Sequence, residues 1–174
     1  RLLSTVISPS EITDAIFGDV NQDSHPDILL TYSSGQSIRM LLNNGSGKFS
    51  DATDDKLPKP LSGNAASVDM GDADGDGDLD IIVAYKDTKD ALLINDGNGN
   101  FAVDATFILP DVIDGSSGIR FCDVNGDGSL DIVTVNNEIV GASSMRPRVH
   151  SNDGLGHFTD KTEIKIETPK LLEV

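Results

Sequence analysis

The chain has 174 residues, of which 37% are hydrophobic and 5% aromatic, and it carries a formal net charge of −16. This acidity excludes binding to a nucleic-acid backbone or to an anionic membrane surface, because both need clustered lysine and arginine side chains. No apolar run approaches the roughly 20 residues that cross a bilayer, so we expect no membrane insertion. The 17 glycines favour short strands and many turns over long helices.

The first third of the chain predicts four short strands separated by turns. Its apolar runs are too short for helices, and an Asn-Gly step supplies the positive φ that a tight hairpin needs. In chain order we expect a strand over residues 15–18, an acidic loop over 19–27, strands over 28–32 and 37–42, an Asn-Gly turn over 43–48 and a strand over 49–53.

The same order of elements returns twice, with acidic loops at residues 72–80 and 123–131 that begin 53 and 51 residues after the preceding one. A four-stranded antiparallel unit cannot bury both of its faces alone, so it needs neighbours packed against it. A β-propeller arranges such units radially as blades, and a stacked solenoid is the second possibility. The further strands are expected over residues 67–71, 81–85, 91–94 and 101–105, and over 118–122, 132–135, 146–150 and 158–162.

We therefore predict an all-β fold in which three four-stranded antiparallel blades form part of a β-propeller. Residues 1–174 form one repeat domain with blades at approximately 12–54, 65–107 and 116–162, and residues 163–174 are a tail or the start of a further blade. Closed propellers usually have four to eight blades. We therefore expect more blades from the parent chain, or self-association, to complete the ring.

Each acidic loop places side-chain oxygens at positions 1, 3, 5 and 9 of a nine-residue segment. A backbone carbonyl at position 7 adds a further oxygen, and two of the copies have at position 6 a glycine that permits a sharp bend. Calcium accepts such oxygen-only ligand sets, whereas magnesium demands a stricter octahedron, so we expect about three structural Ca²⁺ ions. The predicted ligands are Asp19, Asn21, Asp23, the His25 carbonyl and Asp27 in the first loop, Asp72, Asp74, Asp76, the Asp78 carbonyl and Asp80 in the second, and Asp123, Asn125, Asp127, the Ser129 carbonyl and Asp131 in the third.

Two alternatives fit the acidic segments less well than a calcium loop. An EF-hand loop would need a carboxylate at position 12, where this chain has Leu30, Val83 and Thr134. Acidic turns without a metal would account for one copy, but three copies in matched surroundings favour a metal site. We expect the second loop to bind calcium most tightly, because it has the most carboxylates, and the first most weakly, because Ser24 replaces the glycine.

The segments around the loops resemble a known repeat. Residues 17–23 read Phe-Gly-Asp-Val-Asn-Gln-Asp, residues 70–76 and 121–127 echo them, and a glycine-rich hairpin ending in phenylalanine follows in each unit. This pattern resembles the FG-GAP/VCBS repeat, which forms the calcium-loop blades of integrin α-subunit propellers and of many secreted microbial proteins. The resemblance implies a propeller, often of seven blades, with calcium between the first two strands of a blade, and an extracellular location, secreted or at the cell surface.

The resemblance further implies a non-catalytic calcium-binding module for adhesion or ligand binding, with a protein or a carbohydrate as its ligand. Two alternatives stay open: an accessory or catalytic part of a secreted calcium-dependent polysaccharide-degrading enzyme, and a structural assembly module. No catalytic residues are predicted, because the three histidines do not cluster and the single cysteine, Cys122, is expected to be buried in a strand. The connecting segments at residues 54–64, 107–117 and 136–147 are candidates for ligand recognition.

Overall fold

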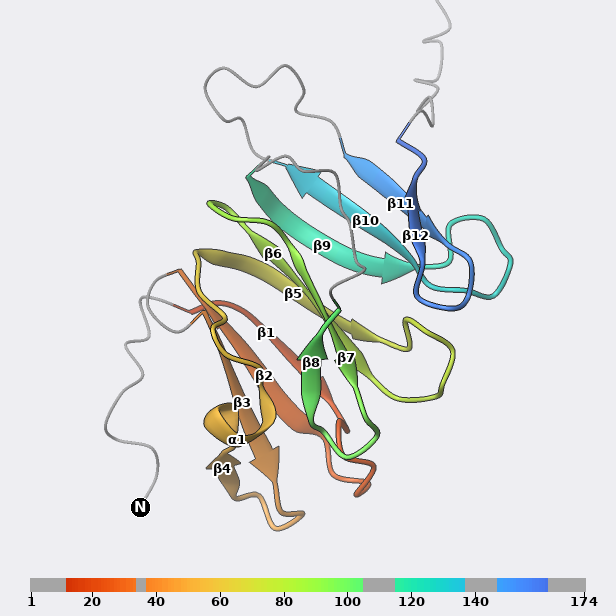
Figure 1. Cartoon of the computed structure of the whole chain (residues 1–174). Coiled ribbons are helices and arrows are strands. Elements are labelled where there is room, and N and C mark those ends of the chain that lie inside the picture. Colours follow the sequence, from red (N-terminus) through yellow and green to blue (C-terminus); the bar gives the residue numbers. More distant parts are fainter. Residues whose placement is uncertain (1–11, 34–36, 105–114, 137–146, 163–174) are drawn as a thin grey trace, which may run out of the picture.

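A computed structural model describes residues 12–33, 37–104, 115–136 and 147–162 (Figure 1). These residues form three four-stranded antiparallel sheets, each with its strands in chain order, which confirms the predicted all-β class and the three four-stranded units. Sheet one contains β1 (Ile12–Gly18), β2 (Asp27–Tyr32), β3 (Ile38–Asn43) and β4 (Phe49–Asp51); sheet two contains β5 (Ala65–Gly71), β6 (Asp80–Tyr85), β7 (Ala91–Asn95) and β8 (Phe101–Val103); sheet three contains β9 (Ser116–Cys122), β10 (Asp131–Asn136), β11 (Arg148–Asn152) and β12 (Phe158–Asp160).

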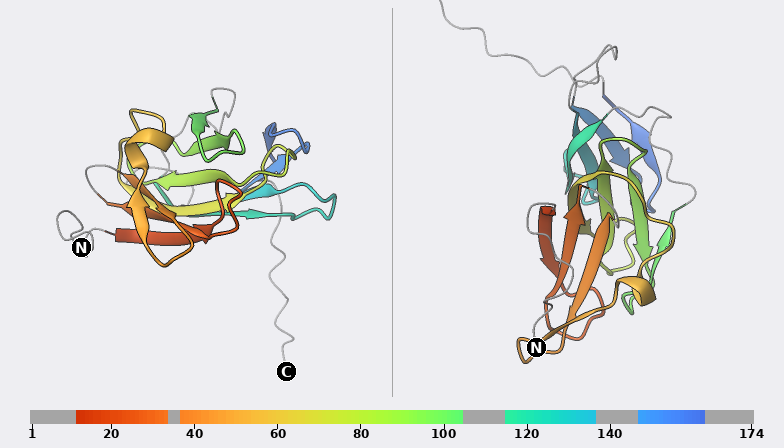
Figure 2. Two further views of the ribbon diagram at one scale, coloured as in Figure 1. Left: turned by 90° about the horizontal axis from the view of Figure 1, so that it is seen from below. Right: turned by 90° about the vertical axis from the view of Figure 1, so that its left-hand side faces the viewer.

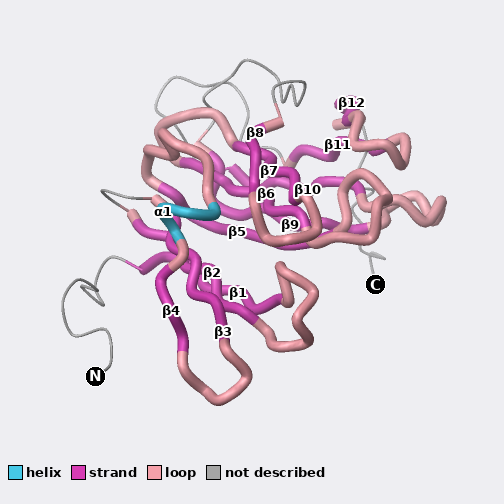
Figure 3. Tube along the Cα trace, turned by 60° about the horizontal axis from the view of Figure 1, so that its bottom comes forward, coloured by secondary structure: helices cyan, strands magenta, loops and turns pink. Residues whose placement is uncertain are grey.

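The fourth strand of each sheet is shorter than predicted. At the ends of β4 and β12 an aspartate side chain accepts the backbone N–H two residues on: Asp51 accepts from Thr53 at 3.1 Å, and Asp160 accepts from Thr162 at 2.8 Å. This local turn competes with continuation of the strand. After β4 the chain forms α1 (Thr53–Lys56), a four-residue helix that the sequence pattern did not predict (Figure 3). No helix in the described ranges has the length and apolarity that a bilayer span requires.

The two ends of each acidic loop are fixed by one residue pair of the antiparallel ladder. The last residue of the first strand lies opposite the aspartate at position 9, which begins the second strand. One residue pair of the ladder therefore closes each loop, and the residues between the two members of the pair form the turn. These closing pairs are Gly18 with Asp27, Gly71 with Asp80 and Cys122 with Asp131.

The three sheets lie next to one another in chain order, with their first strands, β1, β5 and β9, adjacent (Figures 1 and 2). Hydrogen bonds connect these first strands across the sheets. Thr13 Oγ1 donates to the carbonyl of Ala65 at 2.8 Å, and the Phe121 N–H donates to Asp69 Oδ2 at 2.8 Å. Equivalent strands of successive repeats are therefore neighbours in space.

Sheet two is buried on both faces, which accounts for the uninterrupted apolar sequence of β6. Ile81 and Val83 belong to the core between sheets one and two, whereas Ile82 and Ala84 belong to the core between sheets two and three. All four side chains are fully buried. A strand that is covered on both sides has no polar face, so its sequence does not alternate.

Candidate metal centre

The three acidic loops join the first two strands of each sheet and lie along one edge of the molecule (Figure 1). This is the position that the sequence predicted for them. We call residues 19–27 loop one, residues 72–80 loop two and residues 123–131 loop three, and we number the positions of each loop from 1 to 9.

All three loops turn through positive φ at positions 4 and 6. In loop two Gly75 and Gly77 have φ values of 81° and 94°, and loop three also has glycine at both positions. Loop one reaches the same region with Gln22 at 58° and Ser24 at 68°. A residue with a side chain costs roughly 1–2 kcal/mol there. Loop one is therefore strained at two positions; the sequence pattern identified position 6 and missed position 4.

The aspartate at position 1 organises each loop by accepting backbone N–H groups. In loop two, Asp72 accepts from the N–H of Gly75 at 2.8 Å and from that of Gly77 at 3.1 Å, with one oxygen for each. Asp123 accepts the equivalent N–H groups of Gly126 and Gly128, whereas Asp19 accepts those of Asp23 and Ser24, at positions 5 and 6. Because both oxygens of this carboxylate face the turning backbone, the loop wraps around the position-1 side chain.

Positions 3 and 5 differ between the loops in their charge compensation. In loop three the Asn125 amide donates to Asp127 Oδ2 at 2.8 Å, and the Ser129 N–H donates to the other oxygen of Asp127. The bond from the Ser129 N–H and then that from the Asn125 amide lower the pKa of Asp127. Loop one has the same amide-to-carboxylate bond. Loop two has Asp74 at position 3, so no amide can neutralise its neighbour there.

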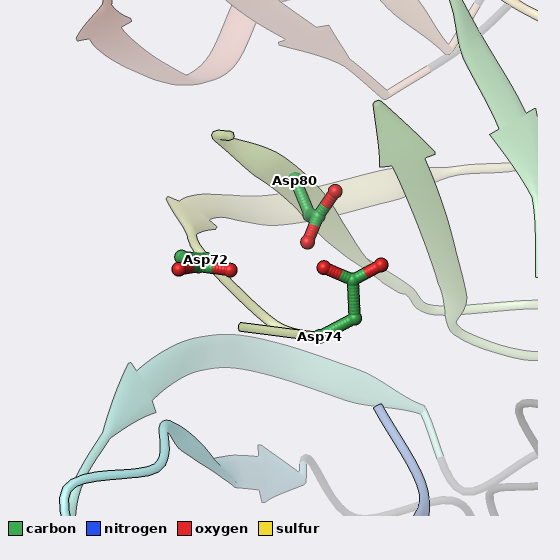
Figure 4. A group of neighbouring side chains, drawn as sticks. All are labelled: Asp72, Asp74 and Asp80. Carbon is green, nitrogen blue, oxygen red and sulfur yellow. The ribbon is translucent and has the colours of Figure 1, made fainter. Parts of the chain in front are cut away.

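Loop two gathers three carboxylates around one space (Figure 4). Candidate ligand oxygens of Asp72, Asp74 and Asp80 all lie within 4.8 Å of one another. Burial, and then the charges of Asp74 and Asp76, raise the pKa of Asp80 from 3.8 to about 6. Burial and the neighbouring carboxylates also raise the pKa of Asp74. A hard dication would relieve this repulsion, and a donor set made only of oxygen suits calcium, so these residues fit the predicted ion.

The group of three side chains does not include the carboxylate of Asp76 or that of Asp78. Asp76 at position 5 is exposed and accepts the Asp78 N–H at 2.9 Å. The Asp78 side chain accepts a hydrogen bond from Gln22 of loop one and lies over Gly97 of the β7–β8 hairpin of its own sheet. His25 and Ser129 lie over the equivalent hairpin glycines of their sheets. The backbone carbonyl at position 7 stays a predicted ligand, and the side chains at this position connect each loop to the neighbouring hairpin.

Loops one and three have asparagine at position 3, and among the described residues no group of three acidic, histidine or cysteine ligands converges in either of them. Their predicted oxygen ligands are nevertheless in the same places on the loop. The side-chain oxygens at positions 3 and 5 accept the N–H groups of positions 5 and 7, as they do in loop two. The three loops thus share one backbone course and differ in charge.

The aspartate at position 9 has a structural role that the sequence reasoning missed. Asp80 is fully buried, and its two oxygens accept the Ala73 N–H at 2.8 Å and the Asn95 N–H at 2.9 Å. It therefore joins position 2 of the loop to the end of the third strand. Asp27 and Asp131 make the same pair of bonds. The signal in the sequence was the asparagine that ends the third strand in every unit, at residues 43, 95 and 152.

The structure also bears on the expectations for the cysteine, the histidines and the connecting segments. Cys122 is exposed rather than buried, because no further sheet lies over it in the described chain. His25 pairs with Asp23 at 3.1 Å, whereas His150 is buried in sheet three. The connecting segment at residues 54–64 is described and borders a cavity, whereas most of residues 107–117 and 136–147 lie outside the described ranges.

Comparison with solved structures shows that the fold occurs elsewhere. One similar structure is described as the structural basis of specific recognition of non-reducing terminal N-acetylglucosamine by an Agrocybe aegerita lectin, with a TM-score of 0.52 and 22% sequence identity. The match covers 84% of this chain and 36% of the lectin chain, so this chain spans about a third of that lectin. A comparison with curated proteins gave no match.

Comparison with family models identifies the repeat itself. The model of the FG-GAP-like repeat matches residues 19–83 and again residues 72–134. Each match begins at position 1 of an acidic loop, and together they cover more than half of the chain. The chain belongs to the family of FG-GAP-like repeat proteins.

Proposed function

We propose that the chain is a calcium-stabilised arc of a β-propeller, and that it serves ligand binding rather than catalysis in an extracellular protein. The observation that carries this proposal is the convergence of Asp72, Asp74 and Asp80 in a loop whose backbone course recurs in loops one and three. Acidic turns without a cation need no common course. A shared backbone course, together with oxygen ligands at equivalent positions, supports a shared kind of ion.

The chain's own residues have separate tasks in such a site. Asp72 folds the loop around itself, Asp80 attaches it to the third strand, and Asp74 supplies the charge that makes loop two the most acidic. The bound ion would supply the positive charge that these carboxylates lack. We propose that loop two binds calcium most tightly and that loop one binds it most weakly, because Gln22 and Ser24 already strain loop one.

The side-by-side arrangement of the sheets supports the propeller. Their first strands are adjacent, as expected when strands near the axis of a radial arrangement approach one another, and sheet two is covered on both faces. The similar lectin chain has the same fold over this arc and is longer than it. Three sheets are fewer than the four to eight of closed propellers, so the arc needs further sheets to close.

Carbohydrates are the first ligand class to test, because the lectin with the similar fold is described as recognising N-acetylglucosamine. A recess of about 410 Å³ lies at the connecting segment after β4. Leu57, Pro58 and Pro60 give it apolar walls, and Asp54 and Lys59, whose charged groups are 2.9 Å apart, lie at its edge. A mostly apolar hollow with a few polar groups is the usual form of a small-ligand site.

Two measurements on chelator-treated protein test the metal. Titration calorimetry records the heat released or absorbed as calcium binds, and thermal unfolding is followed with and without calcium. We expect saturable binding and a rise in the unfolding temperature. Replacing Asp72 and Asp74 together with asparagine should remove the tightest site, whereas Asp54→Asn, an exposed acid outside the loops, should leave calcium binding unchanged. Binding that is absent in the unaltered protein, or equal in the two variants, would refute the calcium site.

The binding function is tested separately, in saturating calcium, with a glycan array and with soluble polysaccharides. We expect binding without cleavage, weakened by Lys59→Ala and unaffected by Lys48→Ala, a lysine on the β3–β4 hairpin, away from the recess. Polysaccharide cleavage by the purified chain would contradict the non-catalytic proposal. Failure of every glycan to bind would leave protein ligands as the class to be screened and would remove carbohydrate from the proposal.

A further inference from the structure

Buried hydrogen bonds connect loop two to loop one through the asparagine that ends the third strand of sheet two. Asp80 at position 9 accepts the backbone N–H of Asn95 at 2.9 Å, and the Asn95 side-chain amide donates to the carbonyl of Val20 in loop one at 2.9 Å. The Val20 N–H in turn donates to Asp27, the aspartate at position 9 of loop one, at 3.2 Å. All four residues are buried. Predicted ligands of two successive sheets are therefore joined through buried groups alone.

The same connection recurs between loop three and loop two. Asp131 accepts the Asn152 N–H at 2.8 Å, and the Asn152 side-chain amide donates to the carbonyl of Ala73 in loop two at 2.7 Å. The Ala73 N–H donates to Asp80 at 2.8 Å, and these residues are also buried. Asp80 uses one oxygen in each connection. A single series of hydrogen bonds therefore joins the three aspartates at position 9, and loop two lies in the middle of it.

A second contact between successive loops passes through the hairpins that join the third and fourth strands. A Cβ placed on Gly156 of sheet three would lie 3.3 Å from the Cβ of Asp74, the predicted ligand at position 3 of loop two. A Cβ placed on Gly99 of sheet two would lie 3.4 Å from the Cβ of Asn21, the predicted ligand at position 3 of loop one. The position-7 side chains of loops two and three lie over these same hairpins. Each of the two hairpins therefore contacts both its own loop and the preceding loop.

Loops one and two share a further hydrogen bond that loops two and three lack. The side-chain amide of Gln22, at position 4 of loop one, donates to the carboxylate of Asp78 at position 7 of loop two. The equivalent residue of loop two is Gly75, which has no side chain to reach loop three. Gln22 makes its bond from a positive φ of 58°, where a glycine would avoid the steric cost but could not contact loop two. Loop one is therefore connected to loop two more strongly than loop three is.

We propose that the three loops are coupled, so that an ion that orders one loop raises the affinity of the neighbouring loop for its own ion, and that Asn95, Asn152 and Gln22 are the positioning residues that couple them. This inference rests on the calcium binding proposed above. Without an ion the carboxylates of a loop repel one another and loosen it. A loop whose neighbour is already ordered loses less conformational entropy when its own ion binds, so the coupling favours binding, and it acts equally in both directions.

A calcium titration of chelator-treated protein, followed by NMR through the backbone amide signals of each loop, measures the affinities of the loops separately. The unaltered chain is compared with the variant that carries both Asp72→Asn and Asp74→Asn, in which loop two is disabled. We expect loop one to bind calcium about fivefold more weakly in the variant, and loop three more weakly by a smaller factor. The comparison is matched in charge, because the two asparagines remove as much negative charge as one bound Ca²⁺ neutralises. Equal affinities of loops one and three in the two proteins would overturn the proposal.

Gln22→Ala tests the coupling without changing a predicted ligand. Alanine keeps a side chain at the positive φ, so the substitution removes the amide and leaves the steric cost in place. It should weaken calcium binding by loop one about threefold in the unaltered chain and should have no effect on loop one when loop two is disabled. Lys48→Ala, an exposed residue of the β3–β4 hairpin, is the control and should change neither affinity. A loss of the same size in both backgrounds would show that Gln22 acts only within its own loop and would contradict the proposal.

Hydrogen exchange in the presence of chelator tests the coupling without the ion. The Gly77 N–H donates to Asp72 within loop two, and Gln22→Ala should speed its exchange about threefold, because loop two loses the support of its neighbour. Lys48→Ala should leave this exchange unchanged. Exchange that is the same in Gln22→Ala and in the unaltered chain would overturn the coupling. Faster exchange in a protein that binds no calcium would refute the metal site and support the coupling of the loops, so the two failures are distinguishable.

Discussion

Loops one and two follow the same backbone course with different residues. Loop two has glycine at both positions of positive φ and aspartate at position 3, whereas loop one has Gln22, Ser24 and the uncharged Asn21. In both loops the carboxylate at position 1 accepts the N–H of position 6, and the carboxylate at position 9 accepts the N–H of position 2. The comparison shows that these two aspartates determine the course of the loop, while glycine and the charge at position 3 set its strain and its attraction for a cation.

The largest effect is expected from removing the aspartate at position 9. Asp80→Ala should lower the free energy of unfolding by about 4 kcal/mol in the presence of chelator, because two buried N–H groups lose their acceptor. Chemical denaturation measures this loss. Asp76→Ala changes an exposed acid of the same loop and should cost less than about 1 kcal/mol without calcium. If Asp80→Ala and Asp76→Ala lower the free energy of unfolding equally in chelator, the aspartate at position 9 is only a metal ligand.

A smaller effect is expected from pH in the metal-free protein. Burial raises the pKa of Asp80 to about 6, above the 3.8 of an unperturbed aspartate, so folding favours its protonated form. The resulting stabilisation, roughly 3 kcal/mol, is complete below pH 3.8 and is lost as the pH rises through 6. Denaturation with chelator between these pH values measures it as the difference between the unaltered protein and Asp80→Asn, because aspartates with lowered pKa values, such as Asp127, change stability in the opposite direction.

Saturating calcium should reverse this dependence, because the ion binds only the ionised carboxylates and therefore stabilises the fold more as the pH rises. Asp27 provides an internal comparison, since burial raises its pKa in the same direction. If the stability of the unaltered metal-free protein relative to that of Asp80→Asn increases from pH 4 to pH 7, the assignment of a buried, protonatable Asp80 is contradicted.

The smallest effect concerns the strain in loop one. Ser24→Gly should stabilise the protein by about 1 kcal/mol, because glycine adopts the positive φ of position 6 without a steric cost. The reverse change in loop two, Gly77→Ser, should destabilise it by a similar amount. Thermal unfolding of the two variants measures both changes. If Ser24→Gly is neutral while Gly77→Ser is costly, the strain assigned to loop one is absent.

Much of the fold could be predicted from the sequence because it depends on neighbours along the chain. Apolar runs, turn residues and a threefold repeat determined the four strands of each unit and placed the acidic loops between the first two. The convergence of Asp72, Asp74 and Asp80 follows from the same local spacing. The early ends of β4 and β12 were missed, although their cause is also local, because an aspartate side chain competed with the strand for a backbone N–H.

Only the tertiary structure decided what lies against each sheet. Asp80 reaches Asn95 on another strand, Gly18 meets Leu79 of the next sheet, and Cys122 is exposed although its strand matches two that are covered. Sequence pattern gives the direction of a side chain relative to its own strand, whereas burial depends on the presence of a neighbouring sheet. The sequence by itself thus determined the repeat and its loops, and packing determined which copies of the same surface are core and which are exposed in the described part of the chain.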